Sequence, residues 1–165
     1  MNPVTRAGAL LAALTLLTVL TGCGVRPTGV VQAGEAPVGV ATGPMLYFLG
    51  EGNVTTAAPR VTGRLGTVAD ALTLLFAGQD PEELASGLNT ALPPVTPVLE
   101  QPDADVMIVR VPLNTVFLSR PALDQIACTA IAARVMAGAG AGLRVTVFGK
   151  NGLAAEDVAC SLMKS

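Results

Sequence analysis

From Met45 onward, segments that favour strands alternate with segments that favour helices, and this alternation constrains the fold more than any other feature of the chain. Thr67-Val68-Ala69-Asp70 has the form of a capping box, in which the first and fourth side chains each accept a backbone hydrogen bond. Apolar positions at helical spacing follow it and predict a helix that Gly78 ends. Ser119-Arg120-Pro121 opens the longest predicted helix, which runs to about Met136.

Short apolar or alternating runs predict the strands around these helices. They are Met45–Leu49, a weaker strand from Val54 to Val61, Val95–Leu99, Asp105–Val111 and Leu143–Phe148, with a turn at Gln101–Ala104. Asp80-Pro81-Glu82-Glu83 predicts a short helical turn up to Gly87, and the segment after Gly152 is expected to be helical. Apolar side chains on both faces of 105–111 predict a strand covered on most of both faces. The sequence thus predicts an α+β domain with the helices packed on one face of a small mixed sheet.

Several of these segments match the pattern of one known family. They are Leu46-Tyr47-Phe48-Leu49, Arg60, Leu-Thr-Leu-Leu-Phe-Ala-Gly at 72–78, Gly-Leu-Asn-Thr-Ala-Leu-Pro at 87–93, the strand at 105–113 and the strand at 145–149. In them the chain resembles the GerMN domain, a sporulation and spore-germination module of bacterial lipoproteins. The resemblance implies a GerMN-like β-α-β-β-α-β sandwich over residues 45–165, with a C-terminal extension, and an association with envelope or sensor-linked lipoproteins.

The chain departs from the family's pattern at two places. Gln79 follows Gly78 where the family often has proline, and the strand that usually ends in a small Asp-Leu-Ser run reads Val111-Pro112-Leu113-Asn114. These departures argue against a partner surface shared with the family more than they argue against the family's fold.

The N-terminal segment has the pattern of an export signal. Ala7–Leu20 is an apolar run preceded by Arg6, and as a helix of about 14 residues it would reach roughly 21 Å, short of a hydrocarbon core of about 30 Å. Leu20-Thr21-Gly22-Cys23 then resembles the lipobox of bacterial lipoproteins, which implies a lipid on Cys23 and removal of residues 1–22. The alternative is an ordinary secretory signal followed by a chance cysteine. The lipobox predicts a protein anchored at the extracytoplasmic face of the cytoplasmic membrane.

Residues 23–44 are expected to form a tether. Glycines recur through this stretch with three prolines and no sustained apolar period, a composition typical of a flexible linker. Parts of Gly29–Val40 are strand-like and could pair along a sheet edge. The anchor itself would be the acyl chains, each methylene of which contributes about 0.8 kcal/mol.

Composition excludes several classes of function. The chain has no histidine, which removes histidine-based nucleophile pairs and histidine metal sites. A net charge of −2, one tyrosine and no basic cluster argue against nucleic-acid binding. Arginine outnumbers lysine, and alanine, glycine, valine and leucine abound, a bias that hints at a GC-rich, actinobacterial source.

The cysteine count predicts one disulfide. If lipid consumes Cys23, the remaining cysteines, Cys128 and Cys160, form an even pair in an oxidising compartment. The alternative is two buried free thiols.

Other polar residues do not form a convincing site in the sequence. Asp103 and Asp105 flank a predicted hairpin and read as solvated turn residues. The Gly138–Gly142 loop follows a helix, whereas a phosphate-binding loop precedes one. Arg110 and Arg144 lie in the middle of predicted strands and either pair at an edge or mark a ligand face.

These observations lead to one functional hypothesis and one alternative. The hypothesis is a non-enzymatic lipoprotein, without metal or cofactor, that binds another protein or assembles with copies of itself. The alternative is a cell-wall-associated enzyme or a small-ligand-binding lipoprotein, which would need a cleft lined by polar groups.

Overall fold

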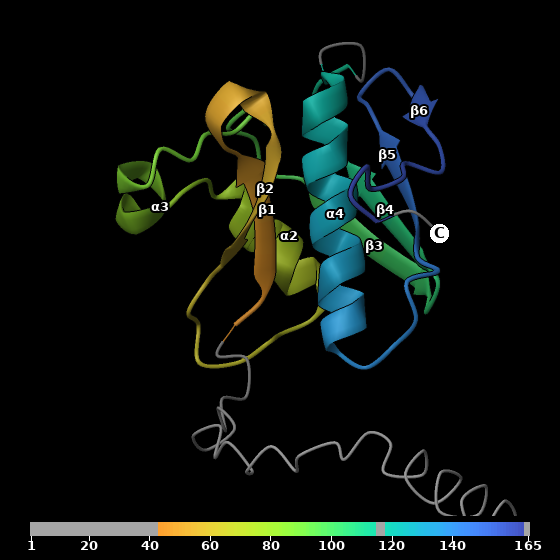
Figure 1. Cartoon of the computed structure of the whole chain (residues 1–165). Coiled ribbons are helices and arrows are strands. Elements are labelled where there is room, and N and C mark those ends of the chain that lie inside the picture. The colour runs from red at the N-terminus through yellow and green to blue at the C-terminus, as the bar shows by residue number, and fades with distance from the viewer. Residues whose placement is uncertain (1–42, 115–117, 164–165) are drawn as a thin grey trace, which may run out of the picture. The chain divides into compact units, whose positions relative to one another are not determined.

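The computed structural model describes residues 43–114 and 118–163 (Figure 1). The predicted signal segment, Cys23 and nearly all of the predicted tether lie outside these residues. In chain order the elements are β1 (Met45–Leu49), the 3-10 turn η1 (Glu51–Asn53), β2 (Thr55–Pro59), α2 (Val68–Phe76), α3 (Pro81–Ala85), β3 (Val98–Asp103), β4 (Val106–Arg110), α4 (Arg120–Met136), β5 (Arg144–Phe148) and β6 (Ala154–Ala155). The described part of the chain is therefore α+β, as the sequence predicts.

The strands form two sheets, so the prediction of a single sheet is wrong. β1 and β2 make an antiparallel hairpin, and the other sheet has the order β3-β4-β5-β6. Within it only β4 and β5 are parallel. Figure 1 shows α4 between the two sheets, where it packs against β1 on one side and β5 on the other. One long helix thus lies along the free edge of β1 and over the inner face of the four-stranded sheet.

The predicted helix starts are confirmed at all three described helices. Before α2, the Thr67 hydroxyl accepts from the Asp70 amide at 3.1 Å and the Asp70 carboxylate accepts from the Thr67 amide at 2.8 Å. Asp80 and Glu83 form a second reciprocal capping box before α3. Ser119 accepts from the Ala122 amide at the start of α4. Each cap satisfies amides that the first turn of a helix leaves unpaired.

The edge of β1 that faces away from β2 is satisfied by other parts of the chain. The Leu49 amide and carbonyl pair with the backbone of Asn89, each at 2.7 Å. The Tyr47 amide donates to the Thr129 hydroxyl at 3.0 Å, and the Gln125 side chain donates to the Tyr47 carbonyl at 3.0 Å. A helix here supplies the bonds that a third strand would make, which ends the small sheet at two strands.

The core lies between the sheets and α4. The largest side chains that are fully buried are Phe48, Leu46, Leu72, Leu75, Met107, Ile126, Gln125, Val109, Val145 and Val147. Met107 and Val109 of β4 and Val145 and Val147 of β5 occupy one face of the four-stranded sheet, the face toward α4. Burial of these apolar surfaces is the main contribution to the stability of the domain.

The β3–β4 hairpin turns later than predicted. Residues 101–103 belong to β3, and the register between β3 and β4 shifts between Glu100 and Asp103. This irregularity accommodates Pro102, which has no amide hydrogen and is tolerated in an edge strand or at a bulge.

The prediction of a C-terminal helix is wrong. Ala154 and Ala155 form β6 against β5, and the Val158 amide donates to the Val145 carbonyl at 2.9 Å. Asp157 has φ +46°, a left-handed conformation that no helix continues through. The segment therefore runs along the edge of β5 in place of forming a helix.

A disulfide attaches this C-terminal segment to α4. The structure pairs Cys128 with Cys160, the pair that the cysteine count predicts. Cys128 is completely buried in α4, and Cys160 is nearly so. Within residues 43–114 and 118–163, no helix is both long enough and apolar enough to cross a bilayer.

Gln125→Leu tests the role of α4 as a substitute strand. The change leaves the Tyr47 carbonyl and the Ala91 amide, which donates to Gln125 at 2.8 Å, without partners in the interior. We expect a loss of about 2–4 kcal/mol in the free energy of unfolding, measured by urea denaturation. Gln101→Leu, at an exposed glutamine, is the control and should change it by less than about 0.5 kcal/mol. Equal effects would contradict the assignment.

Removal of the disulfide tests the attachment of the C-terminal segment. The bridge spans 32 positions, and the chain-entropy model gives it about 4 kcal/mol. We expect Cys128→Ala/Cys160→Ala to lose stability of that order, and hydrogen exchange to rise in residues 153–163 more than in α2. Peptide mapping of the unreduced protein should find the two cysteines linked. Two free thiols in protein purified from an envelope fraction would rule the bridge out.

Candidate functional site

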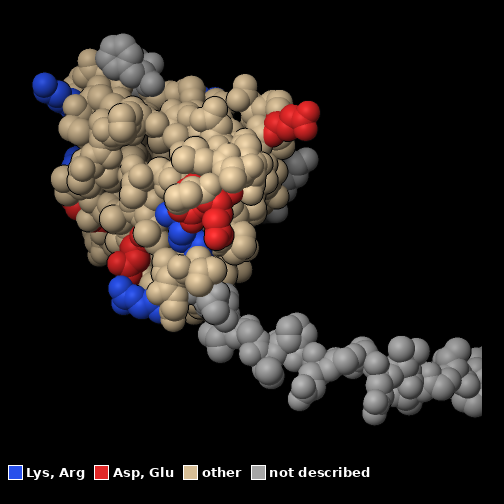
Figure 2. Space-filling view, turned by 90° about the vertical axis from the view of Figure 1, so that its left-hand side faces the viewer, with Lys and Arg blue, Asp and Glu red and all other residues tan. Residues whose placement is uncertain are grey.

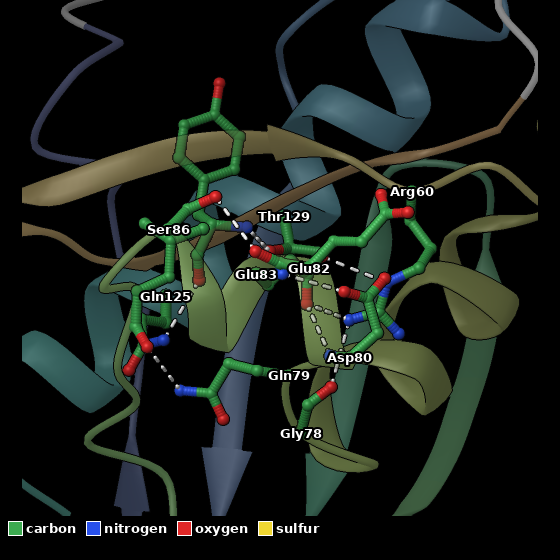
Figure 3. A network of polar contacts seen from close by, with 11 residues as sticks. Arg60, Gly78, Gln79, Asp80, Glu82, Glu83, Ser86, Gln125 and Thr129 are labelled. Atoms are coloured by element: carbon green, nitrogen blue, oxygen red, sulfur yellow. Dashed lines mark hydrogen bonds and ion pairs between the residues drawn. The ribbon is translucent and has the colours of Figure 1, made fainter.

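The most concentrated group of charges surrounds Arg60, just after β2 (Figure 3). The Arg60 Nε lies 3.0 Å from Glu83 Oε1 and 3.3 Å from Asp80 Oδ2, and Arg60 Nη2 donates to the Gly78 carbonyl at 3.0 Å and contacts Glu83 Oε2. The Arg60 guanidinium also lies 5.9 Å from the centre of the Phe48 ring.

This cluster holds the fold together rather than leaving a group free for chemistry. Glu83 is only 6% exposed, and its carboxylate also accepts from the Asp80 amide at 2.9 Å. Arg60 thereby joins the end of the β1–β2 hairpin to the loop that starts α3. A guanidinium is suited to this because its rigid fork of donors meets a carboxylate and a carbonyl at once.

Three other arginines are also paired with carboxylates near them. Figure 2, which faces the side that carries α3, shows a mostly uncharged surface on which acidic and basic atoms meet in a central group. Away from it, Glu100 pairs with Arg110 at 2.9 Å, and Asp105 with Arg134. Among the described residues, no three cysteine, aspartate or glutamate side chains gather closely enough to hold a metal ion.

The carboxylate of Asp103 in the hairpin is satisfied locally, whereas one carboxylate oxygen of Asp124 in α4 is not. The Asp103 carboxylate accepts from the Ala104 amide at 2.7 Å, as in a turn. Asp124 Oδ1 is buried and accepts no hydrogen bond from a described residue, with Arg120 Nε 3.6 Å away. The carboxylates expected to be solvated turn residues do not converge on one site.

Hydrogen bonding shifts the pKa of one acidic cap. The backbone amide of Thr67, then its hydroxyl, and to a lesser extent the positive charge of Arg64, lower the pKa of Asp70 below its ordinary value. Because the folded-state pKa is the lower one, this contribution to stability is present above the ordinary aspartate range and is lost as pH falls through the lowered pKa. The shift follows from helix capping and marks no catalytic acid.

No described helix covers the outer face of the four-stranded sheet, which corrects the prediction that β4 is covered on most of both faces. We call this surface the outer sheet face; the register places on it Val98, Glu100, Val106, Ile108, Arg110, Arg144, Thr146 and Phe148. Val98 is 59% exposed, and Ile108 and Phe148 are half-buried. The Arg110 guanidinium lies 4.8 Å from the centre of the Phe148 ring while it pairs with Glu100. Arg110 therefore pairs across strands, and the surface combines an aromatic ring, an arginine and exposed aliphatic groups.

The sequence predicts some of these placements correctly and misses others. Gly138–Gly142 follows α4 and precedes β5, as a connector does. Arg144 begins β5 and borders a pocket formed with the C-terminal segment. Local sequence gives no signal for the Arg60 cluster, because Asp80 and Glu83 lie 20 or more positions away and only the family resemblance marks Arg60. Cys23, the predicted lipidation site, lies outside the described residues.

Comparison with known proteins adds no relative. No family model, no curated protein and no solved structure is significantly similar to this chain. The proposed function therefore rests on the residues of this chain alone.

Arg60→Met tests whether the cluster is structural. The change keeps the apolar stem and leaves the buried Glu83 carboxylate without its cation, which should cost about 3–5 kcal/mol of unfolding free energy. Adding Glu83→Gln should recover part of this loss, because the stranded charge is then gone. Arg64→Met, at an exposed arginine, is the control. An Arg60→Met protein as stable as the control would contradict the structural role.

Proposed function

We propose that this chain is a lipoprotein anchored through Cys23 at the extracytoplasmic face of the cytoplasmic membrane, and that residues 45–165 form a GerMN-like module that binds another protein or copies of itself. The exposure and composition of the outer sheet face are the main support for the binding proposal. The anchor rests on the apolar run and the Leu20-Thr21-Gly22-Cys23 pattern.

The composition of the outer sheet face favours a protein partner. Aromatic residues and arginine are enriched at protein interfaces, and charged residues other than arginine are depleted at their centres. Phe148, Val98 and Ile108 supply contact area here, and Arg110 lies over the Phe148 ring with its charge paired to Glu100. A partner that covers this part of the face gains apolar burial without leaving an unpaired charge behind.

The free edge of β3 adds a second means of attachment. β3 ends the sheet, so one row of its backbone amides and carbonyls has no strand partner among the described residues. Such an edge accepts an added strand, while Glu100, Pro102 and Asp103 oppose indiscriminate pairing. These features together favour a selective contact.

The order of the described elements supports the GerMN part of the proposal. A hairpin, α2, two strands, α4 and a further strand follow one another as the family's β-α-β-β-α-β order requires, with α3 and β6 as additions. The segments of the resemblance also fall on these elements. Residues 46–49 lie in β1, and 89 pairs with Leu49.

The predicted tether suits a partner near the membrane. Residues 24–44 are about twenty in number, and a flexible chain of that length has a root-mean-square extension of about 25 Å. A lipid on Cys23 would keep the outer sheet face within that order of distance of the bilayer. The mature chain has nine basic and twelve acidic side chains, so attraction to anionic lipid does not supply the anchoring.

Site-specific photo-crosslinking in cells tests the binding surface. A photoreactive residue at Val98 on the outer sheet face should give a defined protein adduct. The same residue at Val54, beside the β1–β2 turn, is a matched control because the two valines are 59% and 60% exposed. We expect an adduct from position 98 and none from position 54. Adducts from both positions, or from neither, would refute the assignment of the face.

Metabolic labelling tests the anchor separately. In cells fed an alkyne fatty acid, the wild-type chain should be labelled and Cys23→Ala should accumulate as an unlabelled precursor. Equal labelling of the two chains would remove the lipoprotein assignment and leave an ordinary secretory signal.

A further inference from the structure

One end of the outer sheet face carries two opposite charges that do not pair with each other. Val106 of β4 lies opposite Asp103 of β3 on one side and opposite Arg144 of β5 on the other. Residues paired in this way place their side chains on the same face of a sheet, about 9–10 Å apart across two strand spacings. Asp103 and Arg144 are both exposed, and neither is part of an ion pair among the described residues. One acid and one base are therefore available to a partner.

The rest of this face is apolar or already neutralised. Val98 is 59% exposed, and Ile108 and Phe148 are half-buried. Arg110 lies between Val98 and Phe148 in the register, over the Phe148 ring, with its charge paired to Glu100 at 2.9 Å. A complementary partner therefore offers an acid and a base at one end of the strands and apolar side chains at the other.

A second copy of the same chain has this pattern. When two outer sheet faces pack together about a two-fold axis that runs along β4, β3 of each copy lies over β5 of the other. The register then places Asp103 of each copy opposite Arg144 of the other, and Val98 opposite Phe148. Because the contact is two-fold symmetric, it forms two ion pairs and two apolar contacts.

The charge pattern also selects the direction of the axis. On an axis along β4, Arg110 meets Arg110 of the second copy, but Glu100 of the same chain already neutralises each of them. A two-fold axis across the strands would instead place Asp103 against Val98 of the other copy and leave a covered carboxylate without a cation, which is unfavourable. The axis along β4 is therefore the one that the side chains favour.

We propose that the partner of the outer sheet face is a second copy of this chain, packed face to face about a two-fold axis along β4. This inference rests on the proposed function and specifies its partner. Rotation about an axis keeps each residue at the same height along it, so both copies of Met45 lie at the same end of the dimer. Both predicted tethers can therefore lead to one membrane.

The size of the face predicts a weak dimer. Three strands over the five residues of β4 cover roughly 14 Å by 17 Å, or about 240 Å², whereas stable complexes bury about 800 Å² on each partner. Anchoring in one membrane raises the effective concentration of the second copy. We therefore expect the dimer to form in membranes and to dissociate when the purified protein is diluted.

Photo-crosslinking of the full chain in membranes tests the identity of the partner. With a photoreactive residue at position 98, two differently tagged versions of the chain expressed together should give an adduct that contains both tags. Trypsin should release the peptide 145–150, which contains Phe148, joined to the peptide that contains position 98.

Two charge reversals test the geometry. Arg144→Glu places acids opposite each other and Asp103→Arg places bases opposite each other, so each variant alone should lower the yield of the two-copy adduct at least about fivefold. When the two variants are expressed together, both contacts of the mixed dimer again join an acid to a base, and the yield of the mixed adduct should return to near the wild-type level. Arg64→Glu, at an exposed arginine outside this face, is the control and should leave the yield unchanged.

The outcomes separate this inference from the proposed function. An adduct of position 98 with a different protein overturns the second copy as partner and leaves the outer sheet face as a binding surface, whereas no adduct overturns both. A two-copy adduct that is indifferent to Arg144→Glu, or a mixed pair that stays at the yield of the single variants, overturns the two-fold arrangement. Both substituted positions are exposed, so each variant should melt at the wild-type temperature, which separates a lost contact from a lost fold.

Discussion

The fold depends on how the second edge of β1 is satisfied. A strand in the middle of a domain must pair the backbone groups on both of its edges, because a buried amide or carbonyl without a partner costs about 1–3 kcal/mol. β2 pairs one edge of β1, and the Asn89 backbone with the Gln125 and Thr129 side chains pairs the other. Gln125 also accepts from the Ala91 amide, so one buried side chain joins α4, β1 and the 88–92 segment.

This arrangement determines which surfaces the domain leaves open. One side of α4 packs against β1, and its opposite side covers the inner face of the four-stranded sheet. No described helix packs on the outer face of that sheet, where Val98, Arg110 and Phe148 lie. The polar clusters at Arg60 and Gln125 are occupied in holding elements together. Among the described residues, the outer sheet face is the surface that these contacts leave open for recognition.

Interactions between residues close in the sequence were the predictable part of this structure. The capping boxes at Thr67 and Asp80 join residues three apart, and both predicted the start of a helix correctly. The Cys128–Cys160 pair was predictable because only two cysteines remain once Cys23 is assigned to lipid.

Features set by distant contacts were not predictable. The division into two sheets depends on Gln125 and Thr129 reaching a strand about 80 positions away, which no local pattern shows. In isolation, the short apolar segment after Gly152 suits either a helix or a strand. Its pairing with β5 determines that it forms a strand. The charges of Arg110 and Arg144 were visible as unusual strand residues, but only the register places Arg110 across from Val98, where it reaches Glu100, and Arg144 across from Val106.

The central claim is that an anchored domain works through the outer sheet face and the free edge of β3. Hydrogen–deuterium exchange of the full chain, compared between native membranes and purified protein, tests it most directly because one edge of β3 has no strand partner in the part of the chain that the structure describes. We expect exchange in residues 98–103 to slow at least severalfold in membranes, while exchange in residues 51–54 at the β1–β2 turn stays unchanged. Identical exchange of residues 98–103 in the two samples, or slowing confined to other segments, would contradict it.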